Sequence, residues 1–204
     1  MIQFNILTSI NCKERVDNIL NTWGAANKQN IVFFSDYTDK EKNILQVATI
    51  TSYTGAAEKT YKRILQIIES NIEWDWYYFI DDDTYVNIAG LNRFIDKVKD
   101  VEKAYGRSCG PDDYQYIHGG AGILVGREAL KNIDIKTLSA ETLAKSSGFS
   151  DLFWGILFKE NNIPLEFYNN SFCGWEHELD INNDIVSVHP IRTQERMEYY
   201  CNLF

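Results

Sequence analysis

Apolar runs of strand length alternate with segments of helical hydrophobic spacing along the first hundred residues of the chain. The strand-like runs lie at residues 2–8, 31–34, 45–50 and 76–80, and the helical segments lie at 12–23, 61–68 and 87–101. Such alternation is typical of an open α/β sheet with helices on both faces, in three layers. Beyond residue 105 the alternation weakens, and we expect strands at 123–125, 165–167 and 185–188 and a helix at 151–161. Because the sequence has no internal repeat and no linker, residues 1–204 are expected to form a single α/β domain.

The charge balance restricts the partners of such a domain. The 204 residues include 20 Lys and Arg and 29 Asp and Glu, which gives a net charge of −9. Binding to nucleic acid or to an anionic membrane through bulk charge requires a basic surface, so neither partner is expected. An acidic protein can still bind phosphates where a divalent cation reverses the local charge. The 5 Trp, 12 Tyr and 11 Phe argue against a disordered acidic chain.

The sequence carries no recognisable targeting segment. Its first residues lack the basic and apolar regions of a signal peptide, and no apolar run approaches the roughly 20 residues of a membrane helix. The four cysteines are widely spaced without a Cys-x-x-Cys pair, which favours free or buried thiols over a zinc site. These features predict a cytoplasmic protein without an intrinsic membrane segment, and a luminal domain trimmed from a secretory-pathway protein would share them.

Three consecutive carboxylates, Asp81, Asp82 and Asp83, directly follow the apolar run at 76–80. Because side chains alternate along an extended chain, Asp81 and Asp83 are expected on one side and Asp82 on the other. Ligands of open α/β sheets bind at the carboxyl ends of strands, where two carboxylates suit Mg²⁺ or Mn²⁺ held together with phosphates. The alternative is an acidic turn that caps a helix beginning at Asn87.

A different phosphate chemistry uses similar residues. Haloacid-dehalogenase-type phosphatases carry Asp-x-Asp-x-Thr after an apolar strand, with the first Asp as the nucleophile. Here Tyr85 stands where that motif needs Thr, and the aspartates follow about the fourth strand instead of the first. A Mg²⁺-dependent phosphohydrolase that uses Asp81 and Asp83 is therefore the weaker interpretation.

Six blocks of sequence, in order, resemble the motifs of one enzyme family. They are Arg15 with Thr22-Trp23, then Val32-Phe33-Phe34-Ser35-Asp36, then Trp74-Asp75-Trp76 before Tyr78-Phe79-Ile80-Asp81-Asp82-Asp83-Thr84-Tyr85-Val86, then Gly119-Gly120-Ala121-Gly122 with Arg127-Glu128-Ala129-Leu130, then Ser150-Asp151-Leu152-Phe153-Trp154-Gly155, and finally Val186-Ser187-Val188-His189-Pro190. Spread from about residue 5 to residue 192, they are similar to the motifs of Fringe-like and core-1 β1,3-galactosyltransferase-like enzymes, glycosyltransferase family 31.

This resemblance implies a GT-A fold, which is a Rossmann-like, open mixed sheet flanked by helices. It also implies a UDP-sugar donor, Mn²⁺ (or Mg²⁺), and inverting transfer of the sugar to a hydroxyl of a glycan, glycolipid or glycoprotein acceptor in a β1,3-type linkage. An alternative of a different class is a carbohydrate- or nucleotide-sugar-binding GT-A domain without activity. Such a domain should have lost Asp81, Asp83 or Asp151, and the chain retains all three.

The resemblance also assigns roles to acidic residues and histidines. Inverting transfer needs a base for the acceptor hydroxyl, and Asp151 matches the acidic motif of the family, although it could instead be an ordinary residue of the first helical turn. Ser150 departs from the family, which usually has a second acidic residue there. The expected metal ligands are Asp81, Asp83 and His189, with His177 as the alternative to His189.

The remaining candidates would bind the donor. The fold implied by the resemblance places uridine and ribose near the ends of the first two strands, at Thr8, Ser35 and Asp36, where Thr8 and Ser35 could equally act as caps. The following helix carries three cationic candidates for the phosphates: Lys59, Lys62 and Arg63. Of these, Lys62 is our choice, and a solvated helix face is its alternative.

Small and aromatic residues complete the candidate donor site beside Asp81 and Asp82. Four small residues would let the backbone approach the donor sugar closely, or they form an ordinary turn into the strand at 123–125: Gly119, Gly120, Ala121 and Gly122. Three tryptophans either stack on sugar rings or belong to the core: Trp74, Trp154 and Trp175.

Overall fold

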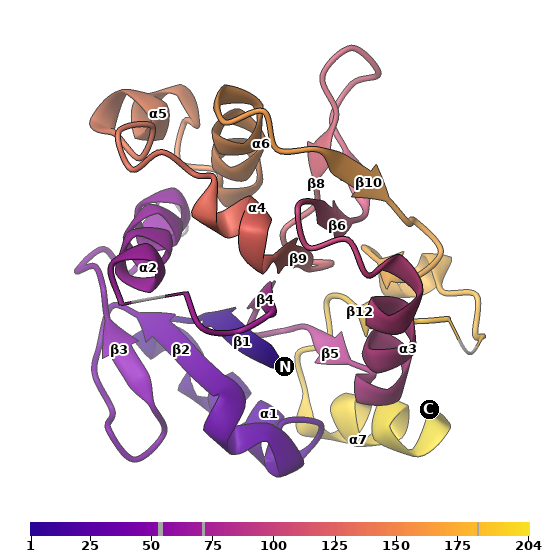
Figure 1. Ribbon diagram of the computed structural model, residues 1–204. Coiled ribbons are helices and arrows are strands. Elements are labelled where there is room, and N and C mark those ends of the chain that lie inside the picture. The colour runs from indigo at the N-terminus through magenta and orange to yellow at the C-terminus, as the bar shows by residue number, and fades with distance from the viewer. Residues whose placement is uncertain (53–54, 71, 183) are drawn as a thin grey trace.

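The computed structural model describes residues 1–52, 55–70, 72–182 and 184–204. Its centre is a seven-stranded mixed sheet (Figure 1). The strands, in spatial order, are β10 (Leu165–Phe167), β6 (Ala104–Gly106), β9 (Ile123–Gly126), β4 (Trp76–Asp81), β1 (Ile2–Leu7), β2 (Ile31–Ser35) and β3 (Ile44–Gln46). The predicted open α/β sheet is confirmed, and the strand expected at 45–50 is shorter than predicted.

Strand direction brings distant segments to one edge of the sheet. Leu7 at the end of β1 pairs in parallel with Phe34 of β2 and with Asp81 of β4, so the carboxyl ends of these three strands lie together. β9 runs antiparallel to β4, and therefore its first residue, Ile123, lies toward the same edge. The glycine-rich segment before β9 consequently meets the aspartates that follow β4.

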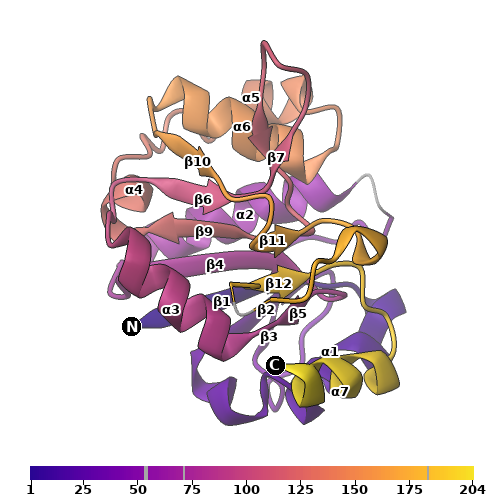
Figure 2. The ribbon, with the colours of Figure 1, turned by 90° about the vertical axis from the view of Figure 1, so that its right-hand side faces the viewer.

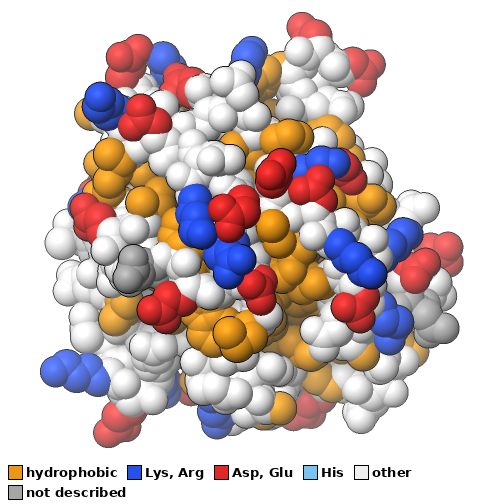
Figure 3. All heavy atoms as spheres, in the orientation of Figure 1, with side chains coloured by type: hydrophobic (Ala, Val, Ile, Leu, Met, Phe, Trp, Pro, Cys, Tyr) orange, Lys and Arg blue, Asp and Glu red, His pale blue; other side chains and the backbone are white. Residues whose placement is uncertain are grey.

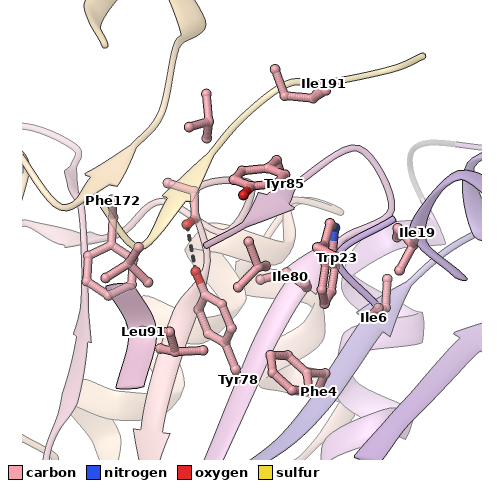
Figure 4. Packing of buried hydrophobic residues seen from close by; sticks show 14 of the residues in the cluster. Phe4, Ile6, Ile19, Trp23, Tyr78, Ile80, Tyr85, Leu91, Phe172 and Ile191 are labelled. Carbon is pink, nitrogen blue, oxygen red and sulfur yellow. Dashed lines mark hydrogen bonds between the residues drawn. The ribbon is translucent and has the colours of Figure 1, made fainter. Parts of the chain in front are cut away.

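Helices cover both faces of the sheet and form the three layers that the sequence predicted (Figures 1 and 2). On one face lie α2 (Ala56–Glu69), α4 (Arg127–Lys131), α5 (Ala140–Lys145) and α6 (Ser150–Glu160). On the other face lie α1 (Lys13–Asn21), α3 (Ile88–Val98) and α7 (Gln194–Leu203). Successive side chains of β4 point to opposite faces of the sheet. Tyr78 and Ile80 therefore join the core on the α1 side (Figure 4), and Tyr77 and Phe79 join the core on the α2 side.

A second, small sheet attaches the C-terminal segment to the end of β4. It consists of β11 (Phe172–Cys173), β12 (Ser187–Val188) and β5 (Tyr85–Val86). The strand expected at 185–188 is thus only two residues long, and it belongs to this sheet instead of the central one. Because β5 begins two residues after Asp83, the pairing of β12 with β5 holds His189 beside the aspartates. A hairpin of β7 (Ser108–Cys109) and β8 (Tyr116–Ile117) leads into the glycine-rich turn.

Acidic and basic side chains are interspersed on the face of the molecule that Figure 3 shows. Among the described residues, no helix is both long enough and apolar enough to cross a lipid bilayer. The cytoplasmic location expected from the sequence stays a prediction.

Candidate active site

A cavity of about 530 Å³ opens at the carboxyl edge of the central sheet. Its walls come from the ends of β1 and β4, the starts of α1, α2 and α6, the turn after β8 and the segments after β11 and β12. Of the residues that the sequence singled out, the cavity wall includes Thr8, Lys59, Asp81, Asp82, Asp83, Gly120, Asp151, Trp175 and His189. Topology therefore gathers in one place candidates that are spread over 182 positions of the sequence.

The three aspartates face different partners, as the alternation of side chains predicts. Asp82 accepts hydrogen bonds from the Thr8 hydroxyl (2.7 Å) and from Arg15 (2.9 Å). Burial raises the pKa of Asp82 to about 6, although these hydrogen bonds oppose the shift. The charge of Asp82 is thus compensated by Arg15 within the protein. This arrangement leaves Asp81 and Asp83 as the pair beside His189.

The alternative role of the aspartates as a helix cap is wrong. The residue that caps α3 is Asn87, whose side-chain oxygen accepts a hydrogen bond from the Gly90 backbone N–H at 3.0 Å. None of the three aspartates supplies that bond, so their position needs a different explanation.

Asp81, Asp83 and His189 place their ligand atoms within 4.8 Å of one another. His189 Nε2 lies 3.2 Å from Asp83 Oδ1, and His189 Nδ1 lies 3.3 Å from the Gly174 carbonyl oxygen. Burial together with the neighbouring charge of Asp83 raises the pKa of Asp81 to about 7, which reflects a local need for positive charge. Two carboxylates and one imidazole form a donor set that suits Mn²⁺ or Mg²⁺, and the residues present therefore fit a divalent cation. His177, the alternative ligand, is an exposed residue of a short 3₁₀ helix outside this group.

Asp83 also contacts two arginines. Its Oδ2 atom lies 3.3 Å from both Arg15 and Arg192. Burial disfavours its charge, but the hydrogen bond and charge of His189 and the charge of Arg15 hold the pKa of Asp83 below its usual range. Asp83 is therefore ionised at neutral pH and available as a metal ligand.

Asp151 lies in the first turn of α6 and also lines the cavity. The helix N-cap is Phe149, which makes no side-chain capping bond, so Asp151 occupies the first-turn position without acting as the cap. Its Oδ1 atom accepts a hydrogen bond from the Ser150 hydroxyl at 3.2 Å. Asp151 is thus both a first-turn residue of α6 and part of the cavity wall.

The glycine-rich turn makes room for protein side chains. A Cβ on Gly119 would lie 2.5 Å from Asp151 Oδ1, and a Cβ on Gly120 would lie 2.6 Å from the His189 ring. Gly122 has a φ of +100° and closes the turn by donating its N–H to the Gly119 carbonyl at 2.9 Å. Of the four small residues only Gly120 is part of the cavity wall, whereas Gly119, Ala121 and Gly122 support it from behind.

The donor-side candidates divide into two sets. Thr8 lines the cavity, while Ser35 and Asp36 are buried behind it. Lys59, also in the cavity wall, donates to Asp36 Oδ2 at 2.7 Å. The choice of Lys62 is not supported, because its ammonium group forms an ion pair with Glu58 one helical turn away and lies outside the cavity wall.

The family model described as Fringe-like matches residues 4–165. The chain belongs to the Fringe-like family. Among curated relatives, the Fringe-like chain is 24% identical over 159 residues to a human beta-1,3-glucosyltransferase, covering 74% of this chain and 31% of that protein. It is 22% identical over 140 residues to the beta-1,3-N-acetylglucosaminyltransferase lunatic fringe of Xenopus laevis, covering 56% of this chain and 36% of that protein. It thus spans about a third of the length of the curated relatives that it matches.

Solved glycosyltransferases share the fold of this Fringe-like chain. The galactosyltransferase LgtC, crystallised with donor and acceptor sugar analogs, superposes with a TM-score of 0.63 at 13% identity, covering 99% of this chain and 95% of that one. A glycosyltransferase involved in glycosylation of the major capsid of PBCV-1 superposes with a TM-score of 0.59 at 16% identity, covering 98% of this chain and 99% of that one. The expected GT-A fold is therefore confirmed.

Three cavity residues of the Fringe-like chain were not identified as functional from its sequence. Arg15 and Arg192 contact Asp83 from elements at opposite ends of the chain, and His118 lines the cavity immediately before the glycine-rich turn. The position of His118 next to Gly119 was the available signal. Of the three tryptophans, Trp154 is fully buried core and Trp74 is half-buried outside the cavity wall, whereas Trp175 is 47% exposed within it.

Proposed function

We propose that this Fringe-like chain transfers a hexose or an N-acetylhexosamine from a UDP-sugar to a hydroxyl of a glycan, glycolipid or glycoprotein acceptor. The transfer inverts the anomeric centre, depends on Mn²⁺ or Mg²⁺, and forms a β1,3 linkage. The observation that carries this proposal is a single cavity that holds Asp81, Asp83 and His189 within 4.8 Å together with Asp151. The two curated relatives named above, both β1,3-glycosyltransferases by name, support the linkage.

In the proposed reaction, Asp151 acts as the general base. It takes the proton of the acceptor hydroxyl as the oxygen attacks the anomeric carbon of the donor. The bond between that carbon and the diphosphate oxygen breaks on the opposite face, and its electron pair leaves with UDP. Asp81, Asp83 and His189 would hold the divalent cation, which supplies positive charge to the departing diphosphate. The Ser150 hydroxyl orients the Asp151 carboxylate through its hydrogen bond to Oδ1.

The nucleoside is assigned to the side of the cavity formed by β1 and α2. Thr8 and Lys59 line this side, and Asp36 fixes the Lys59 ammonium group from behind. Because Ser35 is fully buried, we assign it a supporting position behind the nucleoside instead of a direct contact.

The decisive experiment measures hydrolysis of UDP-glucose, UDP-galactose, UDP-N-acetylglucosamine and UDP-N-acetylgalactosamine with and without Mn²⁺. We expect Mn²⁺-dependent release of UDP from one or more donors. Asp83→Ala should abolish metal-dependent donor binding, whereas Asp151→Asn should bind UDP normally and lose transfer by about 10²–10⁴-fold. Asp112→Asn is the matched control, because Asp112 is exposed and lies outside the cavity wall.

Three results would contradict the proposal. Near-native transfer by Asp151→Asn would remove Asp151 as the base. UDP binding without hydrolysis or transfer for any donor would instead favour a nucleotide-sugar-binding domain. Release of phosphate from a generic monoester, abolished by Asp81→Asn, would indicate a phosphohydrolase.

A further inference from the structure

We propose that Trp175 and His118 form a subsite for the terminal pyranose ring of the acceptor, with the Trp175 indole as its apolar wall. Identification of the ligand as the acceptor sugar rests on the proposed function. The subsite itself rests on the placement of these two side chains in the cavity.

Trp175 is a large aromatic side chain that is fixed in place and yet left open. Its side chain is 47% exposed and lines the cavity. Its carbonyl oxygen accepts hydrogen bonds from the Cys173 thiol (3.1 Å) and from the Glu178 backbone N–H (2.8 Å). The segment is also attached to the metal-ligand strand, because the His189 backbone N–H donates to the Cys173 carbonyl at 3.1 Å. An exposed indole on so well anchored a segment offers a rigid apolar surface to a ligand.

His118 supplies a directed hydrogen-bond donor beside this surface. Its Nδ1 atom accepts a hydrogen bond from the Ala121 backbone N–H at 3.0 Å. In the neutral ring the proton therefore resides on the other ring nitrogen, Nε2. The ring meets Trp175 edge to face, with centroids 6.0 Å apart, and His189 with centroids 5.6 Å apart. The rings of Trp175 and His189 also meet directly, with centroids 6.4 Å apart, so His118 and the indole both pack beside this candidate metal ligand.

Position relative to Asp151 indicates which sugar the subsite takes. His118 adjoins Gly119, and a Cβ on Gly119 would lie 2.5 Å from Asp151 Oδ1, so His118 and the candidate base border the same turn. An acceptor hydroxyl must reach Asp151 to lose its proton, which places the rest of the acceptor ring near His118 and Trp175. The nucleoside side of the cavity, around Thr8 and Lys59, is built from β1 and α2 and is separate from these residues.

The combination matches the chemistry of a pyranose. The C–H face of a sugar ring is apolar and packs on an indole, while its hydroxyls need donors and acceptors placed around the rim. Here the Trp175 indole offers the apolar surface, His118 Nε2 offers a hydrogen-bond donor, and Asp151 offers a hydrogen-bond acceptor. A site built in this way discriminates strongly against a sugar that lacks the paired hydroxyl.

Saturation-transfer NMR tests the subsite directly. The probes are the methyl glycosides of β-galactose, β-glucose, β-N-acetylglucosamine and α-fucose, each offered to the full chain with saturating UDP and Mn²⁺. We expect ring-proton signals for at least one glycoside with the wild-type chain, and loss of these signals in Trp175→Ala. His118→Asn keeps an acceptor atom near the position of Nδ1 but lacks the Nε2 donor, and should weaken binding of the same glycoside roughly tenfold or more.

The control and the second readout separate acceptor binding from donor binding. Tyr199→Ala removes an aromatic side chain that is 46% exposed on α7, outside the cavity wall, and should leave the glycoside signals unchanged. Calorimetry on Trp175→Ala should give the wild-type ratio of UDP-sugar to UDP affinity.

Retention of the glycoside signals in both cavity variants would overturn the proposal, as would the lack of any glycoside signal with a wild-type chain that binds UDP. A fall in the UDP-sugar to UDP affinity ratio would also overturn it, because the indole would then hold the donor sugar. Lack of UDP binding by the wild-type chain would instead refute the proposed function.

Discussion

Lys59 and Asp36 form a buried ion pair beside the cavity, and its removal should destabilise the fold measurably. Lys59 Nζ lies 2.7 Å from Asp36 Oδ2, with only 5% and 0% of the two side chains exposed. The same ammonium group donates to the Thr8 carbonyl at 3.2 Å and thereby joins α2 to the end of β1. Asp36 accepts two further hydrogen bonds, from the Ser9 hydroxyl (2.7 Å) and from the Ile10 backbone N–H (2.8 Å).

Lys59→Met keeps most of the side-chain volume and removes the charge. It leaves the Asp36 carboxylate buried without a counter-ion, and breaking a buried pair in this way costs about 3–5 kcal/mol. The two remaining hydrogen bonds to Asp36 place the expected loss near 3 kcal/mol, a large part of the roughly 5–15 kcal/mol that stabilises a typical domain. Urea unfolding at pH 7 should show a lower midpoint with an unchanged slope.

The pH dependence of this loss identifies its cause. Burial disfavours the Asp36 charge, but hydrogen bonds from Lys59, Ser9 and Ile10 hold the pKa of Asp36 below its usual range in the wild-type fold. The carboxylate therefore stabilises the wild type above its unfolded pKa of about 3.9, and this stability is lost as the pH falls through the lower folded pKa. Burial acts to raise the pKa of Asp36, and Lys59→Met removes a hydrogen bond and a charge that oppose it, so we expect a higher pKa for Asp36 in the variant and its protonation at a pH where the wild type is still ionised.

The difference in unfolding free energy between wild type and Lys59→Met should accordingly shrink from pH 7 to mildly acidic pH. The double variant Lys59→Met with Asp36→Asn should be more stable than Lys59→Met alone, because no unpaired charge remains. A loss below about 1 kcal/mol, or a loss that is the same at both pH values, would refute the reasoning.

Three further outcomes follow from the geometry of the site. Gly120→Ala should weaken Mn²⁺ binding about 10–100-fold in calorimetry, because its Cβ would lie 2.6 Å from the His189 ring; unchanged affinity would mean that this ring is not a ligand. Burial opposes the charged form of His189, but Asp83 and Asp81 hold the pKa of His189 above its usual value. Protons should therefore compete with Mn²⁺, and Mn²⁺ affinity should fall as the pH drops through that pKa. An affinity that does not change with pH, in titrations at several pH values, would exclude proton competition at His189. Asn87 caps α3 through its side-chain oxygen and also donates from Nδ2 to the Ile185 carbonyl at 3.0 Å, so Asn87→Ala should cost at least about 1 kcal/mol and lower Tm by about 2–4 °C or more in calorimetry. Asn87→Ser, which keeps a capping oxygen, should cost less, and equal losses would argue against capping as the cause.

The sequence predicted those parts of the site that depend on strand direction. A buried run followed at once by aspartates, as at the end of β4, indicates a ligand edge because parallel strands end together, and the register of Leu7 with Asp81 agrees with this. The choice between Lys59 and Lys62 depended on helix phase. The two residues are three apart on α2, which separates them by only about 60° around the axis, and hydrophobic spacing alone does not settle which of them faces the sheet.

Long-range pairing accounts for what the sequence did not predict. β12 and β5 have two residues each, too few to carry a periodic signal, yet their pairing is what holds His189 against Asp83. The role of Arg192 depends on the same pairing. The purpose of Gly119 and Gly120 was likewise hidden, since the side chains that lie near their missing Cβ positions, Asp151 and His189, come from 32 and 69 positions further along the chain.

The three consecutive aspartates differ in how far protein cations compensate each carboxylate. Arg15 bridges Asp82 and Asp83 from α1, and Arg192 adds a second cation to Asp83 from the segment after β12. Asp81 has no arginine within ion-pair distance among the described residues, and it is the carboxylate whose pKa is raised to about 7. Protein cations thus compensate Asp82 and Asp83, whereas the charge of Asp81 remains for a divalent cation to balance. The net charge of −9 is therefore distributed unevenly, and the site that still lacks positive charge is the one that would receive the metal and its diphosphate.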